Sequence, residues 1–228
     1  MELLPLIWGS KGVAYIFVDI TSTDKKYNII YADPPWRYSD GGCHGAAENH
    51  YSTMSVADIC ALPVKDITAA DCVLFLWATY PMLLEAMELM ASWGFKYKSI
   101  AFQWVKLNKS GRGYYFGLGR WTRGNTEPCL IGVKGKPYKF VQSKGVSQII
   151  EYPVTRHSAK PPVVRDKIVE LMGNMPRIEL FARDGAAGWD CWGNEAPETN
   201  IPTKAPAFPK ETICQLSLFD IDGGGYSN

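Results

Sequence analysis

The chain contains six short runs of apolar residues separated by polar turns, which is the pattern of buried β-strands. The expected strands cover residues 28–33, 72–78, 99–105, 129–133, 148–152 and 177–182. Near-continuous apolar runs of this length are typical of strands buried on both faces, as in parallel sheets. The first twenty residues are also fairly apolar, and we expect a lead-in strand and a loop there.

Three segments between these strands place apolar residues at helical spacing. The expected helices cover residues 55–62, 83–91 and 164–172, and Ser55 can cap the first of them. Strands that alternate with helices predict an α/β fold, in which a mainly parallel sheet carries helices on both faces. Ligands bind beyond the carboxyl ends of strands in such sheets, where Asp33 and Arg183 stand.

The 228 residues fit one domain followed by a tail. We expect the domain over residues 1–196, because an apolar share of 46% and a charged share of 21% allow a sizeable core. Proline and glycine interrupt residues 197–228, which predicts a mostly disordered tail. No apolar run approaches the length of a membrane span, and Glu2 stands where a signal peptide would carry basic residues.

Cysteine and histidine usage gives no sign of disulfides or of a metal site. The six cysteines form no CxxC pair, and several lie in apolar runs as small buried side chains. The three histidines, His44, His50 and His157, lack the spacing of metal ligands. We therefore expect a cytoplasmic protein that holds no metal.

The most distinctive motif is Asp33-Pro34-Pro35-Trp36, which directly follows an expected buried strand. Prolines cannot donate main-chain hydrogen bonds, so this segment offers carbonyl acceptors at fixed angles. Asp33 adds a charged acceptor and Trp36 adds an aromatic face. A flat base with an exocyclic amine needs acceptors beside the amine and a ring over its plane. The motif therefore predicts a site for such a base, although a carboxylate after a strand could also simply cap a helix.

Basic residues are concentrated from Lys96 to Lys144, where eleven lysines and arginines accompany a single acid, Glu127. Aromatic residues are interleaved with these cations, and the combination favours contact with nucleic acid. Arg120 and Arg123 are candidate contacts, in a glycine-rich stretch over residues 108–125 that we expect to be a mobile loop. The alternative is a solvated surface loop with ordinary core aromatics.

Six segments, in this order, carry a family resemblance: residues 31–36 (YADPPW), 51–55 (YSTMS), 74–77 (LFLW), 125–130 (NTEPCL), 157–161 (HSAKP), and 179–183 (ELFAR) with 192–194 (WGN). Together they resemble the MT-A70 family of S-adenosylmethionine-dependent adenine N6-methyltransferases over roughly residues 28–195. The resemblance implies a permuted Rossmann-like methyltransferase fold, with the catalytic motif ahead of the cofactor-binding end.

The resemblance also implies roles for the matching residues. The catalytic set would be Asp33, Pro34, Pro35 and Trp36. Around the cofactor would lie Asp33, Lys160, Arg183, Asn194 and Glu195. Lys160 would contact the cofactor carboxylate, Arg183 and Asn194 its ribose and adenine, and Glu195 stands where some relatives carry glutamine. Tyr51 and Trp36 would contact the substrate. Taken singly, Lys160 could be a surface lysine before a helix, and we expect Trp77 to be a core residue.

The tail indicates which polymer is the substrate. Gln215, Leu216, Ser217, Leu218 and Phe219 resemble the peptide by which bacterial DNA enzymes dock on the replication sliding clamp. This favours a DNA enzyme in a bacterial cell or a phage-infected host, unless the two apolar residues merely fold back on the domain. Three rival functions stay open: an RNA adenine methyltransferase, a cytosine N4-methyltransferase, and a catalytically inactive nucleic-acid-binding partner subunit.

Overall fold

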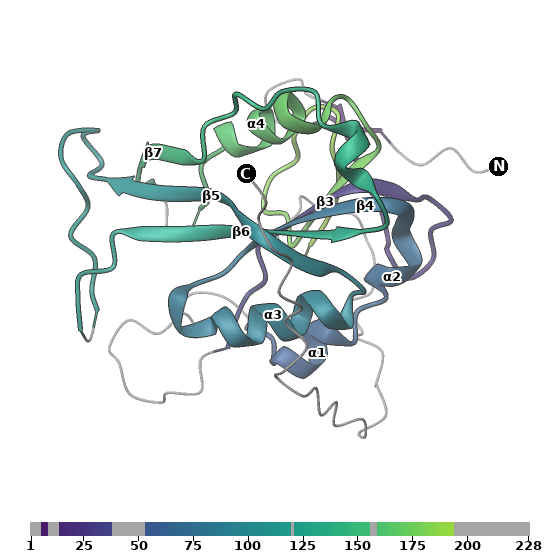
Figure 1. Cartoon of the computed structure of the whole chain (residues 1–228), viewed down its shortest axis with the longest axis horizontal. Coiled ribbons are helices and arrows are strands. Elements are labelled where there is room, and N and C mark those ends of the chain that lie inside the picture. Colours follow the sequence, from purple (N-terminus) through teal and green to yellow (C-terminus); the bar gives the residue numbers. More distant parts are fainter. Residues whose placement is uncertain (1–5, 9–13, 38–52, 120, 156–158, 194–228) are drawn as a thin grey trace, which may run out of the picture.

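A computed structural model describes residues 6–8, 14–37, 53–119, 121–155 and 159–193 of the chain (Figure 1). Its strands form one sheet in the order β1-β2-β9-β8-β3-β4-β6-β5-β7. The strands are β1 Leu6–Trp8, β2 Ala14–Phe17, β3 Tyr27–Ala32, β4 Thr68–Trp77, β5 Lys96–Leu107, β6 Thr126–Lys134, β7 Ile149–Pro153, β8 Arg177–Leu180 and β9 Asp190–Trp192.

The central strands of the sheet run parallel. β2, β9, β8, β3 and β4 are joined by parallel pairs, and β5 is also parallel to β7. β6 lies between β4 and β5 and runs antiparallel to both, and β1 is antiparallel to β2. The expectation of a mainly parallel α/β sheet is therefore confirmed, with one reversed strand inside it that the apolar pattern did not distinguish.

Helices cover both faces of the sheet (Figure 1). α1 Val56–Cys60, α2 Val64–Ile67 and α3 Leu83–Ser92 pack on one face, where Ile30, Leu74 and Leu76 point. α4 Val163–Met172 packs on the other face, where Tyr31, Val73 and Phe75 point. Successive residues of β3 and β4 thus contribute to opposite cores, as the alternation of side chains along a strand requires. Residues 29–32 of β3 and 72–77 of β4 are all apolar because both faces of the sheet are buried there.

The expected elements are all present, with small differences at their ends. α3 and α4 agree with the expected helices within one residue, and Ser55 caps α1 by accepting a hydrogen bond from the amide of Asp58. α2 and β9 were not expected, because four and three residues are too short to give a periodic signal. β8 ends at Leu180 because Phe181 adopts the left-handed conformation, with a φ of 60°.

Several predictions lie outside the described residues. They concern Tyr51, Arg120, Asn194 and Glu195, and the tail over residues 197–228 with its motif at 215–219. Among the residues that are described, no helix is long and apolar enough to cross a membrane. The same part of the chain holds no cluster of histidine, cysteine and acidic side chains suited to a metal ion.

Candidate active site

The site is built at the carboxyl edge of the parallel strands. Asp33 follows β3 directly, and the last residue of β3, Ala32, pairs with Leu76 of β4 and Leu180 of β8. Arg183 stands three residues beyond the end of β8, so it belongs to the same edge. Lys160 comes from the segment that precedes α4. The expectation that Asp33 and Arg183 mark the ligand-binding edge is therefore consistent with the topology.

Four charged side chains form a continuous chain of ion pairs at this edge. The ammonium nitrogen of Lys160 lies 2.7 Å from a carboxylate oxygen of Asp33 and 3.1 Å from one of Glu127. The second oxygen of Glu127 lies 2.8 Å from the ammonium nitrogen of Lys106. The side chain of Lys160 is only 8% exposed, whereas that of Asp33 is 22% exposed. Of the two carboxylates in these ion pairs, Asp33 is therefore easier for a ligand to reach than Glu127.

The two carboxylates in this row of ion pairs, Asp33 and Glu127, differ in pKa. Burial raises the pKa of Asp33 above its ordinary value, and the nearby Lys160 only partly offsets this effect. Burial also opposes ionisation of Glu127, but Lys160 and Lys106 outweigh it and hold the pKa of Glu127 below its ordinary value. Burial likewise opposes the charge of Lys160, and the two carboxylates outweigh it and raise its pKa. Lys160 is therefore a permanent cation at this site.

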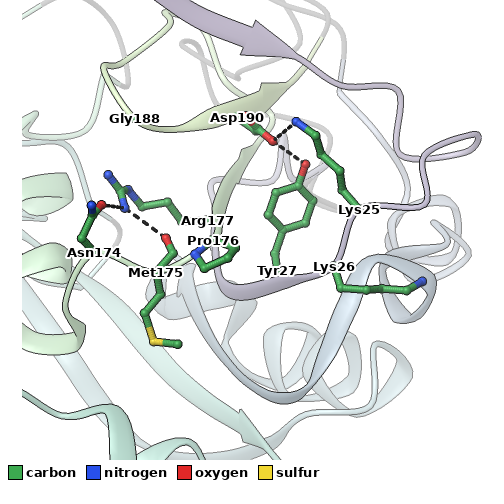
Figure 2. Close-up of a pocket in the computed structure, with 9 residues that line it drawn as sticks. All are labelled: Lys25, Lys26, Tyr27, Asn174, Met175, Pro176, Arg177, Gly188 and Asp190. Carbon is green, nitrogen blue, oxygen red and sulfur yellow. Dashed lines mark hydrogen bonds and ion pairs between the residues drawn. The ribbon is translucent and has the colours of Figure 1, made fainter. Parts of the chain in front are cut away.

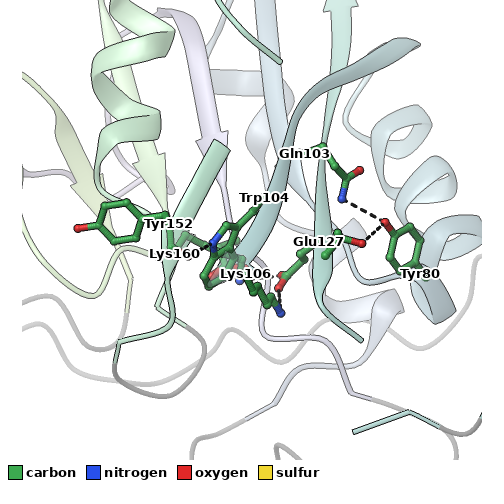
Figure 3. A network of polar contacts seen from close by, with 9 residues as sticks. Tyr80, Gln103, Trp104, Lys106, Glu127, Tyr152 and Lys160 are labelled. Carbon is green, nitrogen blue, oxygen red and sulfur yellow. Dashed lines mark hydrogen bonds and ion pairs between the residues drawn. The ribbon is translucent and has the colours of Figure 1, made fainter. Parts of the chain in front are cut away.

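Two tryptophan rings lie against the two lysines of these ion pairs, and Figure 3 shows one of them, Trp104, beside Lys106. The ammonium of Lys160 is 5.6 Å from the ring centre of Trp77, and that of Lys106 is 4.9 Å from the ring centre of Trp104. The two rings meet edge to face with centres 6.5 Å apart, and the indole of Trp104 donates to the carbonyl of Tyr152 at 2.9 Å. Ring faces attract cations, so the aromatic pair stabilises the two buried lysines.

Trp36 of the Asp-Pro-Pro-Trp motif is almost completely covered. It is 5% exposed, and its indole nitrogen donates to the main-chain carbonyl of Trp77 at 3.3 Å. The expected open aromatic face is therefore absent from this structure, because the ring packs into the core beside α1 and α3. Stacking of Trp36 on a base stays a prediction, and the observed contacts instead show Trp36 fixed to the end of β4. Trp77 is a core residue, as expected.

The prolines of the motif hold the chain in a tight turn. The carbonyl of Pro34 accepts the amide of Trp36 at 2.9 Å, and the carbonyl of Pro35 accepts the amide of Met54 at 2.9 Å. Each carbonyl oxygen keeps a second lone pair that can accept from a ligand. The Met54 contact also holds the main chain at Met54 next to the Asp-Pro-Pro-Trp motif.

The structure brings Asp33 and Lys160 into direct contact. Burial raises the pKa of Asp33, and the positive charge of Arg183 is close enough to oppose that rise in part. Arg123 lies elsewhere, in the connection between β5 and β6, where its guanidinium is 4.9 Å from the ring centre of Phe116. Sequence reasoning did not assign a role to Glu127, Lys106 or Trp104. Glu127 carried one usable signal, since it is the sole acid between Lys96 and Lys144.

A separate hollow of about 470 Å³ lies at the opposite, amino edge of β3 and β8 (Figure 2). Tyr27 and Lys25 contact Asp190 there at 2.7 and 2.9 Å, and Arg177 donates to the side chain of Asn174 at 2.7 Å. The hollow holds none of the residues of the candidate site. Its lining is already joined by these contacts and lies a full strand length from Asp33.

Sequence comparisons identify the family of this chain. The MT-A70 family model matches residues 27–195, which span the sheet from β3 onward and include Asp33, Lys160 and Arg183. The chain belongs to the MT-A70 family.

Its relatives are methyltransferases of two kinds. The type II methyltransferase M.MunI of Mycoplasma sp is 35% identical over 195 residues, covering 78% of this chain and 81% of the relative. The MT-A70-like N(6)-adenosine-methyltransferase of Arabidopsis thaliana is 29% identical, covering 85% of this chain and 27% of the relative. The N(6)-adenine-specific methyltransferase METTL4 of Mus musculus is 31% identical, covering 75% and 38%. The chain thus spans most of M.MunI but well under half of the two eukaryotic proteins.

Proposed function

We propose that this protein transfers a methyl group from S-adenosylmethionine to the N6 amine of adenine in DNA. The observation that carries the proposal is the pair of Asp33 and Lys160, joined at 2.7 Å at the carboxyl edge of the sheet in a chain of the MT-A70 family. Asp33 begins the Asp-Pro-Pro-Trp motif, and its side chain is more exposed than that of Glu127, the other carboxylate of these ion pairs.

The residues at this edge fit S-adenosylmethionine by the chemistry of their side chains. The cofactor supplies a methyl group on a positively charged sulfur. The carboxylate of Asp33 suits that positive charge, and the ammonium of Lys160 suits the cofactor carboxylate. Arg183 stands at the same edge, and we assign it, together with Asn194 and Glu195, to the ribose and adenine of the cofactor. Lys160 is already dehydrated where it lies between two carboxylates. Exchanging one of these partners for the carboxylate of the cofactor therefore has a modest free-energy cost.

Asp33 would activate the amine by accepting a hydrogen bond from it. The lone pair of an adenine amine is delocalised into the ring, so the amine is a weak nucleophile in its planar form. Acceptors on both N–H groups favour a pyramidal nitrogen, and Asp33 and the free lone pair of the Pro34 carbonyl would provide them. The negative charge of Asp33 would stabilise the positive charge that grows on N6 as the N–C bond forms and the S–C bond of the cofactor breaks. The methylated N6 would then release one proton to solvent, so Asp33 need not remove it. Positioning of the two reactants supplies the rest of the acceleration.

We favour DNA over RNA for two reasons. The relative that this chain spans most completely is a type II methyltransferase, whereas the chain spans about a quarter of the plant adenosine methyltransferase. The tail motif, with Gln215, Leu216, Leu218 and Phe219, also favours docking on a bacterial sliding clamp. An RNA adenine methyltransferase is the second candidate, because the adenosine methyltransferases match up to 86% of this chain.

Methyl transfer to defined polymers tests the proposal. The purified protein would be incubated with S-adenosylmethionine carrying a labelled methyl group and with DNA or RNA of mixed sequence. We expect label in DNA as N6-methyladenine, identified by mass spectrometry of nucleosides. Label that enters RNA alone would replace the DNA assignment, and label at cytosine N4 would replace the adenine assignment. No transfer to either polymer, despite measurable cofactor binding, would support the inactive partner subunit.

The tail proposal needs its own experiment, because the motif lies outside the described residues. We propose that it tethers the enzyme to the clamp in the cytoplasm of a bacterial or phage-infected cell. Immobilised full-length protein should capture the purified clamp, and the Leu218→Ala, Phe219→Ala double variant should lose it. Capture that survives both substitutions refutes the tether and leaves the methyltransferase assignment unaffected.

A further inference from the structure

The connection between β5 and β6, residues 108–125, projects beyond the ends of both strands and away from the sheet (Figure 1). We call it the finger. At its base, the amide of Tyr115 donates to the carbonyl of Lys106 at 2.7 Å, and Leu107 pairs with Tyr114. Beyond this base, the large apolar side chains are exposed to solvent, with Trp121 94% and Leu118 81% exposed. An exposed tryptophan and leucine on one projection are unusual for a surface without a partner.

The finger is too thin to cover its own apolar side chains. A Cβ atom on Gly117 would overlap the carbonyl oxygen of Gly124, and one on Gly119 would overlap that of Thr122. The two legs of the finger therefore lie against each other along their main chains, and only glycine fits at these positions. With no space between the legs, the side chains of Leu118 and Trp121 must point outward. The glycines thus give a narrow main-chain ridge rather than a small folded unit.

The charge of the finger favours nucleic acid as its partner. Residues 108–125 contain no acid, and they include Lys109, Arg112 and Arg123. The nearest acid in the sequence, Glu127, is buried between Lys106 and Lys160 and does not offset this charge at the surface. A protein surface would have to supply acidic groups for these cations, whereas a nucleic acid supplies phosphates next to the flat bases on which aromatic side chains stack.

The finger leaves the sheet at the edge that carries Asp33. Trp77, at the carboxyl end of β4, pairs with Cys129 of β6. Trp104 pairs with Glu127, which is one position from Thr126, the residue at which β6 meets the finger. The ion pairs from Lys106 through Glu127 and Lys160 then connect the root of the finger to Asp33. A nucleic acid bound along the finger would therefore pass close to the catalytic carboxylate.

We propose that Leu118 and Trp121 form a wedge that enters the base stack beside the target adenine and holds the opened duplex. This inference rests on the proposed DNA methyltransferase function. An adenine in a duplex cannot present its amine to Asp33 unless it leaves the stack. Proteins that distort DNA commonly insert apolar side chains between base steps for this purpose. The narrow ridge carries such side chains at its outer end, and the cations beside them contact the phosphates.

Two DNA substrates separate the wedge from other roles of the finger. The target sequence would first be read by sequencing methylated adenines in DNA from cells that express the chain. One duplex then carries the target adenine paired with thymine, and the other carries it opposite an abasic site, where extrusion needs less work. The variant combines Leu118→Ala with Trp121→Ala. Leu84→Ala, which removes an exposed leucine from α3, serves as the matched control.

We expect the double variant to lose about tenfold or more in kcat/KM on the paired duplex and little on the abasic duplex. The Leu84 control should match the wild type on both. An equal loss on the two substrates overturns the wedge, as does no loss on either. If that equal loss accompanies conversion of a dimer to a monomer in sedimentation, the finger instead contacts a second copy of the chain. A wild-type protein that methylates neither duplex refutes the proposed function, and the wedge with it.

Discussion

Lys160 contacts Asp33 at 2.7 Å while also contacting Glu127 at 3.1 Å, so one ammonium group holds a partly exposed and a buried carboxylate together. Asp33 follows β3 and Glu127 belongs to β6, and these strands are separated in the sheet by β4. Lys160 thus connects the Asp-Pro-Pro-Trp motif to the root of the finger.

Replacing Lys160 by methionine should destabilise the protein by about 3 kcal/mol or more, because two carboxylates then share a buried site without their common cation. Urea unfolding followed by circular dichroism measures the difference. Adding Glu127→Gln to this variant should recover part of the loss, since it removes the repulsion between the Glu127 and Asp33 carboxylates. A loss that is the same with and without the Glu127 substitution would contradict the shared role of Lys160.

The acid limb of the pH–rate profile should report the pKa of Asp33. Only the ionised carboxylate accepts from the amine, and burial raises its pKa, so activity should fall at a pH above the ordinary aspartate value of 3.8. Glu127→Gln removes a nearby negative charge that raises the pKa of Asp33, so the limb should move to lower pH. Measurement of kcat/KM against pH tests this. Asp71→Asn, at an aspartate near the other end of β4, should leave the limb in place.

Trp36→Phe should lower kcat by about fivefold without changing the affinity for the cofactor. Phenylalanine keeps an aromatic ring but removes the N–H group that donates to the carbonyl of Trp77, a bond worth about 1 kcal/mol. Steady-state kinetics and calorimetric titration with the cofactor measure the two quantities. If Trp36 acts through stacking on the base alone, Trp36→Phe keeps a nearly normal kcat and Trp36→Leu loses it.

A second buried ion pair supports the sheet behind the site. The guanidinium of Arg165 in α4 contacts both oxygens of Glu179 in β8, at 2.5 and 2.8 Å. Arg165→Met should cost about 3 to 5 kcal/mol of unfolding free energy, because it leaves the buried Glu179 carboxylate without a partner. The Arg165→Met, Glu179→Met double variant should be markedly more stable than Arg165→Met. Chemical denaturation that finds the two variants equally stable would contradict this account.

The residues that the sequence predicted best are those fixed by local pattern. The apolar runs located β3 and β4 because these strands are buried on both faces, and the motif after β3 placed Asp33 at the ligand-binding edge. α3 and α4 followed from their apolar stripes. Such features depend on neighbours in the chain, so a single sequence contains them.

The missed features depend on contacts between distant segments. Glu127 is a site residue because β6 is inserted antiparallel between β4 and β5, and its apolar pattern does not show this direction. The burial of Trp36 follows from its contact with the carbonyl of Trp77, forty-one positions away. The thin finger follows from the approach of two legs of chain, although its glycines suggested only a mobile loop. The position of Glu127, the burial of Trp36 and the thin finger all depend on contacts between segments that are distant in the sequence.

The proposed mechanism depends on the negative charge of Asp33 at the edge of β3. Single-turnover methylation of DNA by the Asp33→Asn variant tests this dependence most directly. Asparagine has nearly the same shape and keeps one acceptor oxygen, but it cannot stabilise positive charge on N6 in the same way. We predict that the variant folds, binds S-adenosylmethionine, and forms N6-methyladenine about a hundredfold or more slowly than the wild type. Methylation at a rate close to that of the wild type would contradict the assignment of Asp33 as the catalytic carboxylate.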